Sequence, residues 1–445
     1  MEKEKLAVFS IIGRGRQRKD KTRGYEQTKY VFNPGSKENA YETKETAFFG
    51  ISLYEYLSKK LNDVPEKFVI LGTNKSAWSE LVSLIPEEKQ GELSTITLYD
   101  KLYNQENDDS SFVSKETLQE WEGLLREFVP SIRLYIIEPL DFYTYVDIIL
   151  KEIDDNSTYK LVFDCTHGYR YIPIVFSYAV MLAKKLRKVQ QIRFFYGAFE
   201  MKEYYDFPEN TSPVVEIDAV NHFIELIEAT SIYNVSGYFP NILSLIGIPD
   251  TNETYFKLEM NQNPRTEIIK ISNNLGTISN THKHFYIREI SGKLLRDFQE
   301  LANQEKVYMR LFKRAKFFFE HYNYLKALTL IFESTVMVFT DAYGIKKDYL
   351  SYETRSEARK KMRQEIKNIL YYDKPERNIL IKEKQEAESL KILEAVRNSA
   401  AHGSIPHVNQ KYLVNEKEFK KLFTSACTTF EKMVERLKKS RQLQN

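Results

Sequence analysis

Near the end of this 445-residue sequence, Arg397 and Asn398 precede His402 at a spacing that suits chemistry on a phosphate group. A histidine titrates near neutral pH and can move a proton, and a guanidinium matches the geometry of a phosphate. RNA cleavage without metal needs both, because the ribose 2′-hydroxyl loses a proton, the leaving 5′-oxygen gains one, and negative charge develops at phosphorus. Arg397 and His402 are therefore candidate catalytic residues, and Asn398 is a neighbour that orients one of them by hydrogen bonding.

The placement of this group on a helix decides how its members act together. An apolar stripe predicts a helix over 391–401, and Gly403 is placed as a left-handed C-cap. Five residues of helix turn through about 500°, so Arg397 and His402 lie about 140° apart on an ideal helix. Either fraying at Gly403 lets the imidazole swing, or each side chain meets its counterpart from a second chain across a two-fold axis. The alternative without chemistry is that His402 only caps helix carbonyls.

A second polar group lies between the strand-like run 160–164 and an apolar helical segment. Its members are Thr166, His167, Gly168 and Arg170. Gly168 permits close approach of the backbone, and the start of the following helix favours an anion. Thr166 and His167 can hydrogen-bond a ligand, and Arg170 can pair with a phosphate. The structural alternative is that Asp164 and Thr166 only cap the helix.

Two further loops follow apolar runs in the first half of the chain. The first contains Gly13, Arg14, Gly15 and Arg16, and the second contains Thr73 and Asn74. The Gly-x-Gly start is similar to a dinucleotide fingerprint, but Arg18 stands where the third glycine belongs, so no nicotinamide cofactor is expected. A basic loop suits several phosphates, and the alternative is a solvated surface loop.

The elements that must position these loops change in character along the chain. Apolar runs at 6–12, 68–71, 133–137, 160–164 and 192–196 alternate with helical segments, which predicts an α/β fold with a mostly parallel sheet. Ligands of such sheets bind beyond the carboxyl ends of the strands, where the three loops lie. Helical pieces then surround an irregular polar stretch at 261–283, and only helical periodicity follows. We therefore expect three segments: 1–217, 218–300 and an all-α bundle at 301–445.

Composition narrows the classes of function. The net charge is only +3, so a site for a polyanion must be local. Two cysteines exclude a disulfide scaffold and fit a reducing cytoplasm. No secretory signal and no membrane-spanning segment is expected. The remaining histidines lack cysteine or carboxylate partners at ligand spacing, so no metal site is predicted; they are His222, His282, His284, His321 and His407.

These residues resemble the CARF domain of CRISPR-associated type III effectors. The likeness rests on Gly13-x-Gly15, the Leu71-Gly72-Thr73 turn and Asp164-x-Thr166-His167-Gly168-x-Arg170-x-x-Pro173. The Arg397-x4-His402 motif within helices is similar to a HEPN ribonuclease domain. The resemblance covers most of 1–217 and 301–445.

The resemblance implies a Rossmann-like CARF domain followed by a helical HEPN bundle, in a cytoplasmic homodimer. Proteins of this kind bind cyclic tetra- or hexa-adenylate on the two-fold axis and then cut single-stranded RNA without metal, here with Arg397 and His402. The region 218–300 would couple the two domains. The residues that would line the messenger pocket are Ser10, Gly13, Arg14, Gly15, Arg16, Thr73, Asn74, Thr166, His167, Gly168 and Arg170.

Three alternatives stay open. The chain is a CARF regulator without enzymatic activity, or a nucleotide-activated DNase that requires a divalent metal. The third is a ring nuclease, in which Ser10, Thr166 and His167 position the 2′-hydroxyl of the cyclic ligand for cleavage.

Overall fold

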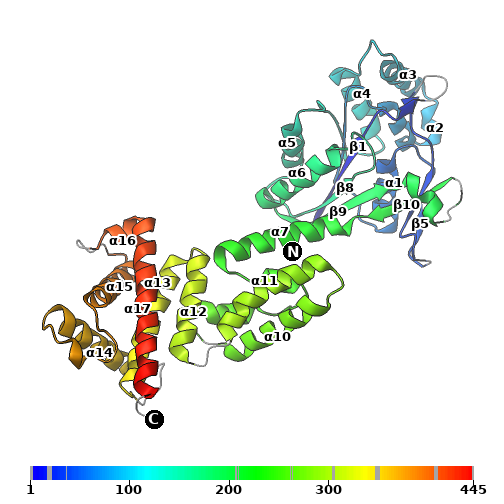
Figure 1. Cartoon of the computed structure of the whole chain (residues 1–445). Helices are drawn as coiled ribbons and strands as arrows, with labels where there is room; N and C mark the ends of the chain where they lie inside the picture. The colour runs from blue at the N-terminus through cyan, green and yellow to red at the C-terminus, as the bar shows by residue number, and fades with distance from the viewer. Residues whose placement is uncertain are drawn as a thin grey trace. The chain divides into compact units, whose positions relative to one another are not determined.

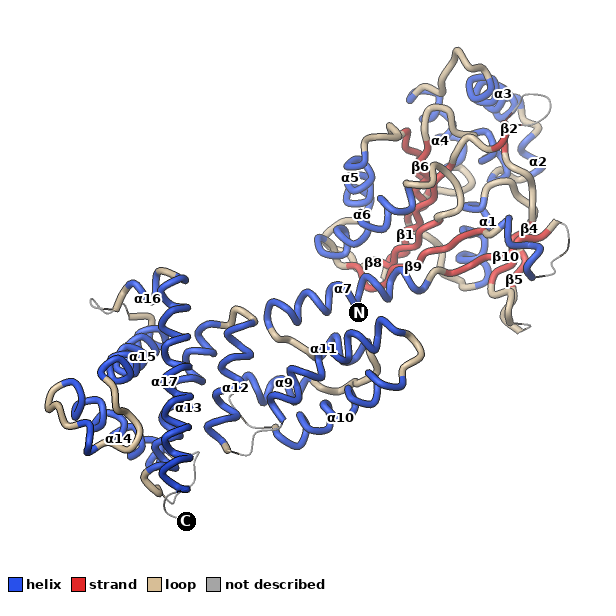
Figure 2. The backbone as a smooth tube through the Cα atoms, in the orientation of Figure 1, coloured by secondary structure: helices blue, strands red, loops and turns tan. Residues whose placement is uncertain are grey.

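The computed structural model describes residues 4–17, 23–36, 38–205, 208, 210–260, 262, 264–302, 306–345, 351–404 and 409–442. The chain divides into two compact units, Met1–Ile224 and Glu225–Asn445, and the boundary falls within helix α7 (Asp218–Ser236) (Figure 1). Unit 1 contains the strands and unit 2 is helical in its described residues (Figure 2). The predicted fold class, a mostly parallel α/β sheet followed by a helical region, is confirmed.

Unit 1 is built on an eight-stranded sheet in the order β5-β4-β10-β9-β8-β1-β6-β7. The five strands from β9 to β7 are parallel, whereas β10 is antiparallel to β9. The strands are β1 (Lys5–Ile12), β4 (Lys29–Phe32), β5 (Tyr41–Glu42), β6 (Lys67–Gly72), β7 (Ile132–Ile136), β8 (Tyr159–Asp164), β9 (Val189–Gly197) and β10 (Thr211–Glu216). The short hairpin β2 (Arg16–Gln17) and β3 (Arg23–Gly24) lies outside this sheet.

The continuous apolar run of β1 follows from its central place in the sheet. Leu6 and Val8 belong to the core on one face, and Ala7 and Phe9 belong to the core on the other. Because side chains alternate along a strand, both faces of β1 need apolar residues when helices cover both. The first face packs against α1 (Phe49–Glu55) and α4 (Lys115–Arg126), and the second packs against α5 (Phe142–Glu152) and α6 (Ile172–Leu186).

Five further helical elements belong to the described part of unit 1. They are η1 (Tyr56–Lys60), η2 (Trp78–Leu84), α2 (Glu87–Gln90), α3 (Leu93–Asn107) and η3 (Phe199–Tyr205).

Unit 2 has one hydrophobic core that runs through the whole unit, from Leu226 to Leu437. The segment expected as a connector, up to residue 300, therefore shares its core with the helices that follow. The prediction of an irregular polar stretch at 261–283 is wrong. Residues 265–281 form helix α10, which buries Ile268, Ile271 and Leu275 at helical spacing. No helix in the described part of the chain is long and apolar enough to cross a membrane.

The remaining helices of unit 2 are α8 (Pro240–Leu245), α9 (Asn252–Glu259), α10 (Arg265–Thr281), α11 (Phe285–Ala302), α12 (Val307–Glu320), α13 (Tyr324–Ala342), α14 (Tyr352–Leu370), η4 (Pro375–Arg377), α15 (Lys384–His402), α16 (Lys411–Val414) and α17 (Glu416–Gln442).

Candidate functional site

A cavity of about 460 Å³ opens in unit 1 at the carboxyl ends of β1, β6 and β8. Parallel strands end at the same edge of a sheet, so the loops that follow them meet there. The structure brings together most of the residues predicted from the sequence: Gly13, Arg14, Gly15, Thr73, Thr166, His167 and Gly168 all line this cavity.

Glycines let the loops after β1 and β8 approach each other closely. A Cβ atom on Gly13 would lie 3.0 Å from the backbone nitrogen of Gly168. Gly168 has a φ of +92°, and a Cβ there would lie 2.6 Å from Cγ2 of Ile11. Both the left-handed conformation and the lack of space require glycine at position 168.

Asp164, the last residue of β8, fixes the loop that follows this strand. Its carboxylate accepts a 2.6 Å hydrogen bond from the hydroxyl of Ser10 and a 2.8 Å bond from the backbone N–H of Thr166. Burial raises the pKa of Asp164 to about 6, although these two hydrogen bonds oppose the rise. The hydroxyl of Thr166 in turn accepts a 2.8 Å bond from the N–H of Gly197 on β9.

Ser10 is not in the wall of the cavity. Its side chain is fully buried and its hydroxyl is bonded to Asp164. Ser10 lies within strand β1 and not in the loop that follows it, so the structure places its side chain against Asp164 and not in the cavity.

His167 sits in an aromatic environment at the floor of the cavity. Its ring packs against Tyr25, with 4.2 Å between ring centroids, and against Phe48. The Nε2 atom accepts a 3.2 Å hydrogen bond from the N–H of Phe49, so the neutral ring carries its proton on Nδ1. Burial lowers the pKa of His167 to about 3. His167 is therefore a neutral hydrogen-bonding group, unsuited to act as a general base near pH 7.

The cations at the rim of the cavity are already bonded to the loop that links α3 to α4. Arg14 Nη2 lies 2.9 Å from the carboxylate of Asp109. The ammonium of Lys75 donates to the carbonyl of Asp108 and lies 4.5 Å from the ring centroid of Phe112. A ligand phosphate at this rim would compete with Asp109 for the guanidinium of Arg14.

Several residues depart from the sequence prediction. Asn74 and Arg170 are not among the residues that line the cavity; Arg170 is exposed, just before α6. The side chain of Arg16 lies outside the described residues, as does all of His407. Arg23 and Tyr25 line the cavity although they were not predicted from the sequence, and Lys75, from the predicted loop after β6, lines it as well. The hydroxyl of Tyr25 accepts a 2.7 Å bond from the N–H of Gly13, a contact that no local motif announces.

A smaller cavity of about 160 Å³ adjoins the first and shares Tyr25, Thr166 and His167 with it. Its other lining residues include three aromatic and two acidic side chains: Tyr30, Tyr196, Phe199, Glu26 and Glu200. Flat aromatic walls beside a carboxylate suit the stacking and hydrogen bonding of a nucleobase.

In unit 2 the predicted catalytic residues lie at the end of α15, which ends as the sequence predicts. Gly403 adopts the left-handed conformation, with a φ of 66°, and its N–H bonds to the carbonyl of Ser399. The helix starts earlier than predicted, at Lys384, because Glu383 and Glu386 form a capping box. His402 is exposed on the last turn.

Arg397 is held by two neighbours. Its Nη2 atom lies 3.3 Å from the carboxylate of Glu333 on α13, and its Nη1 atom donates a 3.1 Å bond to the side-chain oxygen of Asn398. His402 lies about 7.5 Å further along the helix axis. The described residues of one chain therefore show no hydrogen bond or ion pair between Arg397 and His402.

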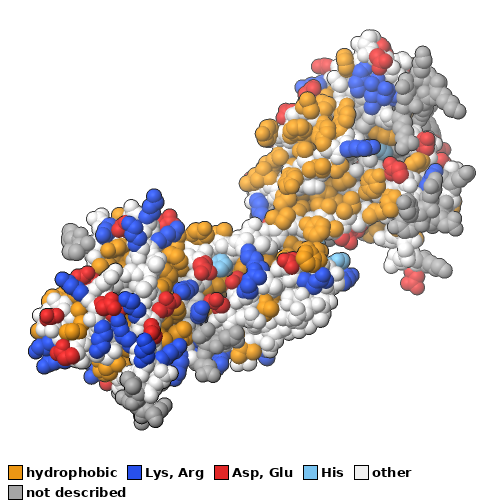
Figure 3. All heavy atoms as spheres, in the orientation of Figure 1, with side chains coloured by type: hydrophobic (Ala, Val, Ile, Leu, Met, Phe, Trp, Pro, Cys, Tyr) orange, Lys and Arg blue, Asp and Glu red, His pale blue; other side chains and the backbone are white. Residues whose placement is uncertain are grey.

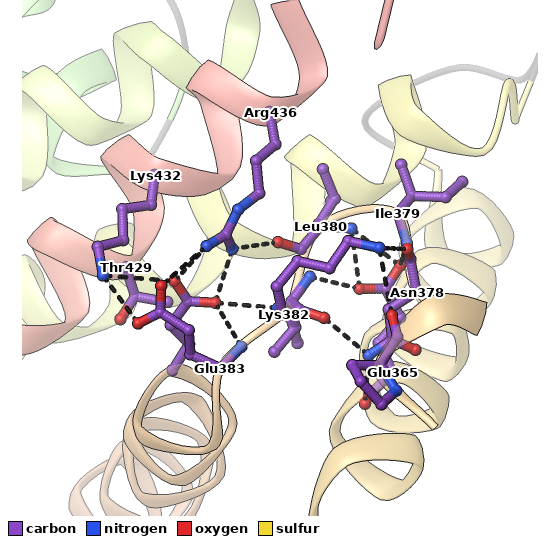
Figure 4. A network of polar contacts seen from close by, with 12 residues as sticks. Glu365, Asn378, Ile379, Leu380, Lys382, Glu383, Thr429, Lys432 and Arg436 are labelled. Atoms are coloured by element: carbon purple, nitrogen blue, oxygen red, sulfur yellow. Dashed lines mark hydrogen bonds and ion pairs between the residues drawn. The ribbon is translucent and has the colours of Figure 1, made fainter. Parts of the chain in front are cut away.

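The start of α15 is fixed by a network of polar contacts that Figure 4 shows. The buried carboxylate of Glu365 on α14 accepts bonds from the N–H groups of Ile379, Leu380 and Ile381. On the other side, Arg436 of α17 donates to the carbonyl of Leu380 and pairs with Glu386. Because the loop before α15 is held at both ends, the position of α15 is coupled to α14 and α17.

Comparison with known proteins assigns the first unit. Residues 7–201 match the family model described as "CRISPR system endoribonuclease Csx1, CARF domain". A solved structure of Enterococcus italicus Csm6 bound to cyclic hexa-2′-fluoro-hexa-dAMP is similar at 12% identity, with a TM-score of 0.35, over 98% of this chain and 94% of that chain. No curated protein matches the chain.

Proposed function

Residues 7–201 are a CARF domain of the Csx1 type, and from this premise we propose that the chain is a ribonuclease activated by cyclic oligoadenylate. Unit 1 binds the cyclic messenger in the cavity at β1, β6 and β8. Unit 2 then cuts single-stranded RNA without metal, with Arg397 and His402 as catalytic residues. This ribonuclease acts in type III CRISPR antiviral defence.

The observation that carries the proposal for unit 1 is the cavity itself. Three loops supply backbone N–H groups, hydroxyls and the guanidinium of Arg14 at one sheet edge, which suits the phosphates of an oligonucleotide. The adjoining aromatic cavity suits a base. Gly13 and Gly168 allow the loops after β1 and β8 to pack closely against each other at this cavity.

An exposed apolar stripe on α6 supports a homodimer of CARF domains. Ile174, Tyr178, Leu182 and Leu186 recur every four residues, and each is between 47% and 69% exposed. Figure 3 shows apolar side chains gathered over this part of unit 1. Large apolar patches mark interaction sites, and a second copy of the chain would place two identical cavities around one symmetric ring.

For unit 2, the proposal rests on the chemistry of α15. Arg397 is held in place to stabilise the charge of the transition state, and exposed His402 is free to meet a substrate and transfer a proton. Asn398 orients the guanidinium of Arg397. The ring-nuclease alternative loses support because the side chain of Ser10, one of its three positioning residues, is buried and bonded to Asp164.

The experiment that tests the proposal incubates labelled single-stranded RNA with the protein and either cyclic tetra-adenylate or cyclic hexa-adenylate in EDTA. Cleavage with one activator, and none without it, is the expected result. Binding of an activator without RNA cleavage would instead favour the regulator. Cleavage of DNA that EDTA abolishes would favour the metal-dependent DNase.

A further inference from the structure

Glu333 on α13 is a single carboxylate shared by three arginines. It lies 2.7 Å from Arg355 and 3.7 Å from Arg359, both on α14, and 3.3 Å from Arg397 on α15. Three positive charges against one negative charge leave this arginine cluster, defined by Arg355, Arg359 and Arg397, with a surplus of two positive charges. The surplus favours an added anion.

The hydrogen-bond donors of the arginine cluster also exceed its acceptors. Arg355 directs both Nε and Nη2 at Glu333. The Nε atoms of Arg359 and Arg397 are buried and have no hydrogen-bond partner within the described residues. Each guanidinium has five N–H donors, whereas one carboxylate offers about four lone-pair sites. An oxyanion would satisfy donors that Glu333 cannot reach.

The surplus charge faces outward. The Glu333 side chain is 9% exposed, whereas those of Arg355, Arg359 and Arg397 are 37%, 28% and 22% exposed. The guanidiniums of Arg359 and Arg397 lie 5.4 and 5.3 Å from the ring of Phe332, which restricts their freedom. The arginine cluster is therefore partly buried and pre-organised, and its guanidiniums are accessible from solvent.

We propose that Arg355 and Arg359 form a phosphate subsite for the RNA substrate together with Arg397. The inference deepens the proposed function and rests on it, because Arg397 joins this subsite to the helix that carries His402. Guanidinium forks match phosphate oxygens, and a backbone phosphate carries no sequence information. The subsite would hold the RNA backbone close to the cut without selecting bases.

A matched control lies one turn further along α14. Arg363 has the same charge, but it forms a bidentate pair with its own partner, Glu394, and so contributes no surplus. Arg359→Gln and Arg363→Gln therefore remove the same charge from the same helix, and only the first removes it from the arginine cluster.

The test measures binding of a fluorescein-labelled single-stranded RNA to the full-length His402→Ala chain between 50 and 200 mM KCl. Arg355→Gln and Arg359→Gln should each weaken binding several-fold at low salt and reduce the slope of log K against log salt by about 0.7. Arg363→Gln should leave the slope unchanged. Glu333→Gln, which raises the local charge, should strengthen binding and steepen the slope.

Equal slopes for Arg359→Gln and Arg363→Gln would overturn the subsite while the proposed ribonuclease stands. The expected binding pattern in a protein whose wild type cuts no RNA would support the subsite and overturn the ribonuclease. Absence of RNA binding by the parent chain would overturn both. If circular dichroism shows that Arg359→Gln does not fold, the RNA affinity of Glu333→Gln tests the proposal instead. Weaker binding by Glu333→Gln than by the parent chain would contradict it.

Discussion

The hydroxyl of Ser10 on β1 donates a 2.6 Å hydrogen bond to the carboxylate of Asp164 at the end of the neighbouring strand β8. This contact ties the base of one cavity loop to the centre of the sheet. It also holds a carboxylate in a buried site, where the charged form is disfavoured.

Asp164 should make the stability of unit 1 depend on pH. The pKa of Asp164 is about 6 in the folded state and about 4 in an unfolded chain, so the folded state binds the proton more tightly. The contribution of Asp164 to the free energy of unfolding is therefore fully present below about pH 4 and is lost as pH rises through 6. A pKa difference of two units amounts to about 3 kcal/mol. In Asp164→Asn, the stability of unit 1 should not fall over this pH range.

The measurement is urea unfolding at pH 4.5, 5.5 and 7, followed by tryptophan fluorescence. Both tryptophans, Trp78 and Trp121, are buried in unit 1, so the signal reports that unit alone. An identical change with pH in the wild type and in Asp164→Asn would show that Asp164 is not the titrating group.

Gly168→Ala should impair ligand binding in unit 1. The substitution places a Cβ atom 2.6 Å from Ile11 and forces a left-handed conformation that costs about 1–2 kcal/mol, so the loop after β8 must move. We expect calorimetry to show at least tenfold weaker binding of the activating cyclic oligoadenylate. The control is Gly35→Ala, where nothing lies within 4 Å of the added atom; equal affinities for the two variants would refute the role of Gly168.

Glu365→Gln should destabilise unit 2. A glutamine has one acceptor oxygen, whereas Glu365 accepts from three backbone N–H groups and from the hydroxyl of Tyr343. Loss of these acceptors in a buried site should cost about 2–4 kcal/mol. Urea unfolding followed by circular dichroism at 222 nm measures the cost, with Glu388→Gln, exposed on α15, as the control. Unchanged stability of Glu365→Gln would contradict the importance of the network in Figure 4.

The parallel centre of the sheet was predictable because β1, β6 and β8 are apolar on both faces, which leaves long uninterrupted runs. The edge strand β5 was not, because it has only two residues and no such run. Helix α10 was missed because its solvent-facing residues are polar and hide the stripe of Ile268, Ile271 and Leu275.

The candidate sites show the same division. Loops that follow strands could be located from the sequence, because strand order brings their ends together. Tyr25 and Glu333 could not be identified from the sequence, because each contacts its partner from another segment of the chain. Tyr25 follows the hairpin β2–β3 and bonds to Gly13, which precedes it. Glu333 and Arg397 are 64 residues apart. The end of α15 was predictable because Gly403 is a local signal.

The proposed ribonuclease depends on proton transfer by exposed His402 in metal-independent RNA cleavage. The most direct measurement is the rate of single-stranded RNA cleavage in EDTA, with the activating cyclic oligoadenylate, by wild type, His402→Ala and the control His284→Ala. His284 is also exposed and lies outside the proposed site. We expect His402→Ala to lower the rate at least about 100-fold and His284→Ala to keep the wild-type rate. Full activity of His402→Ala would rule out His402 as the proton-transfer group.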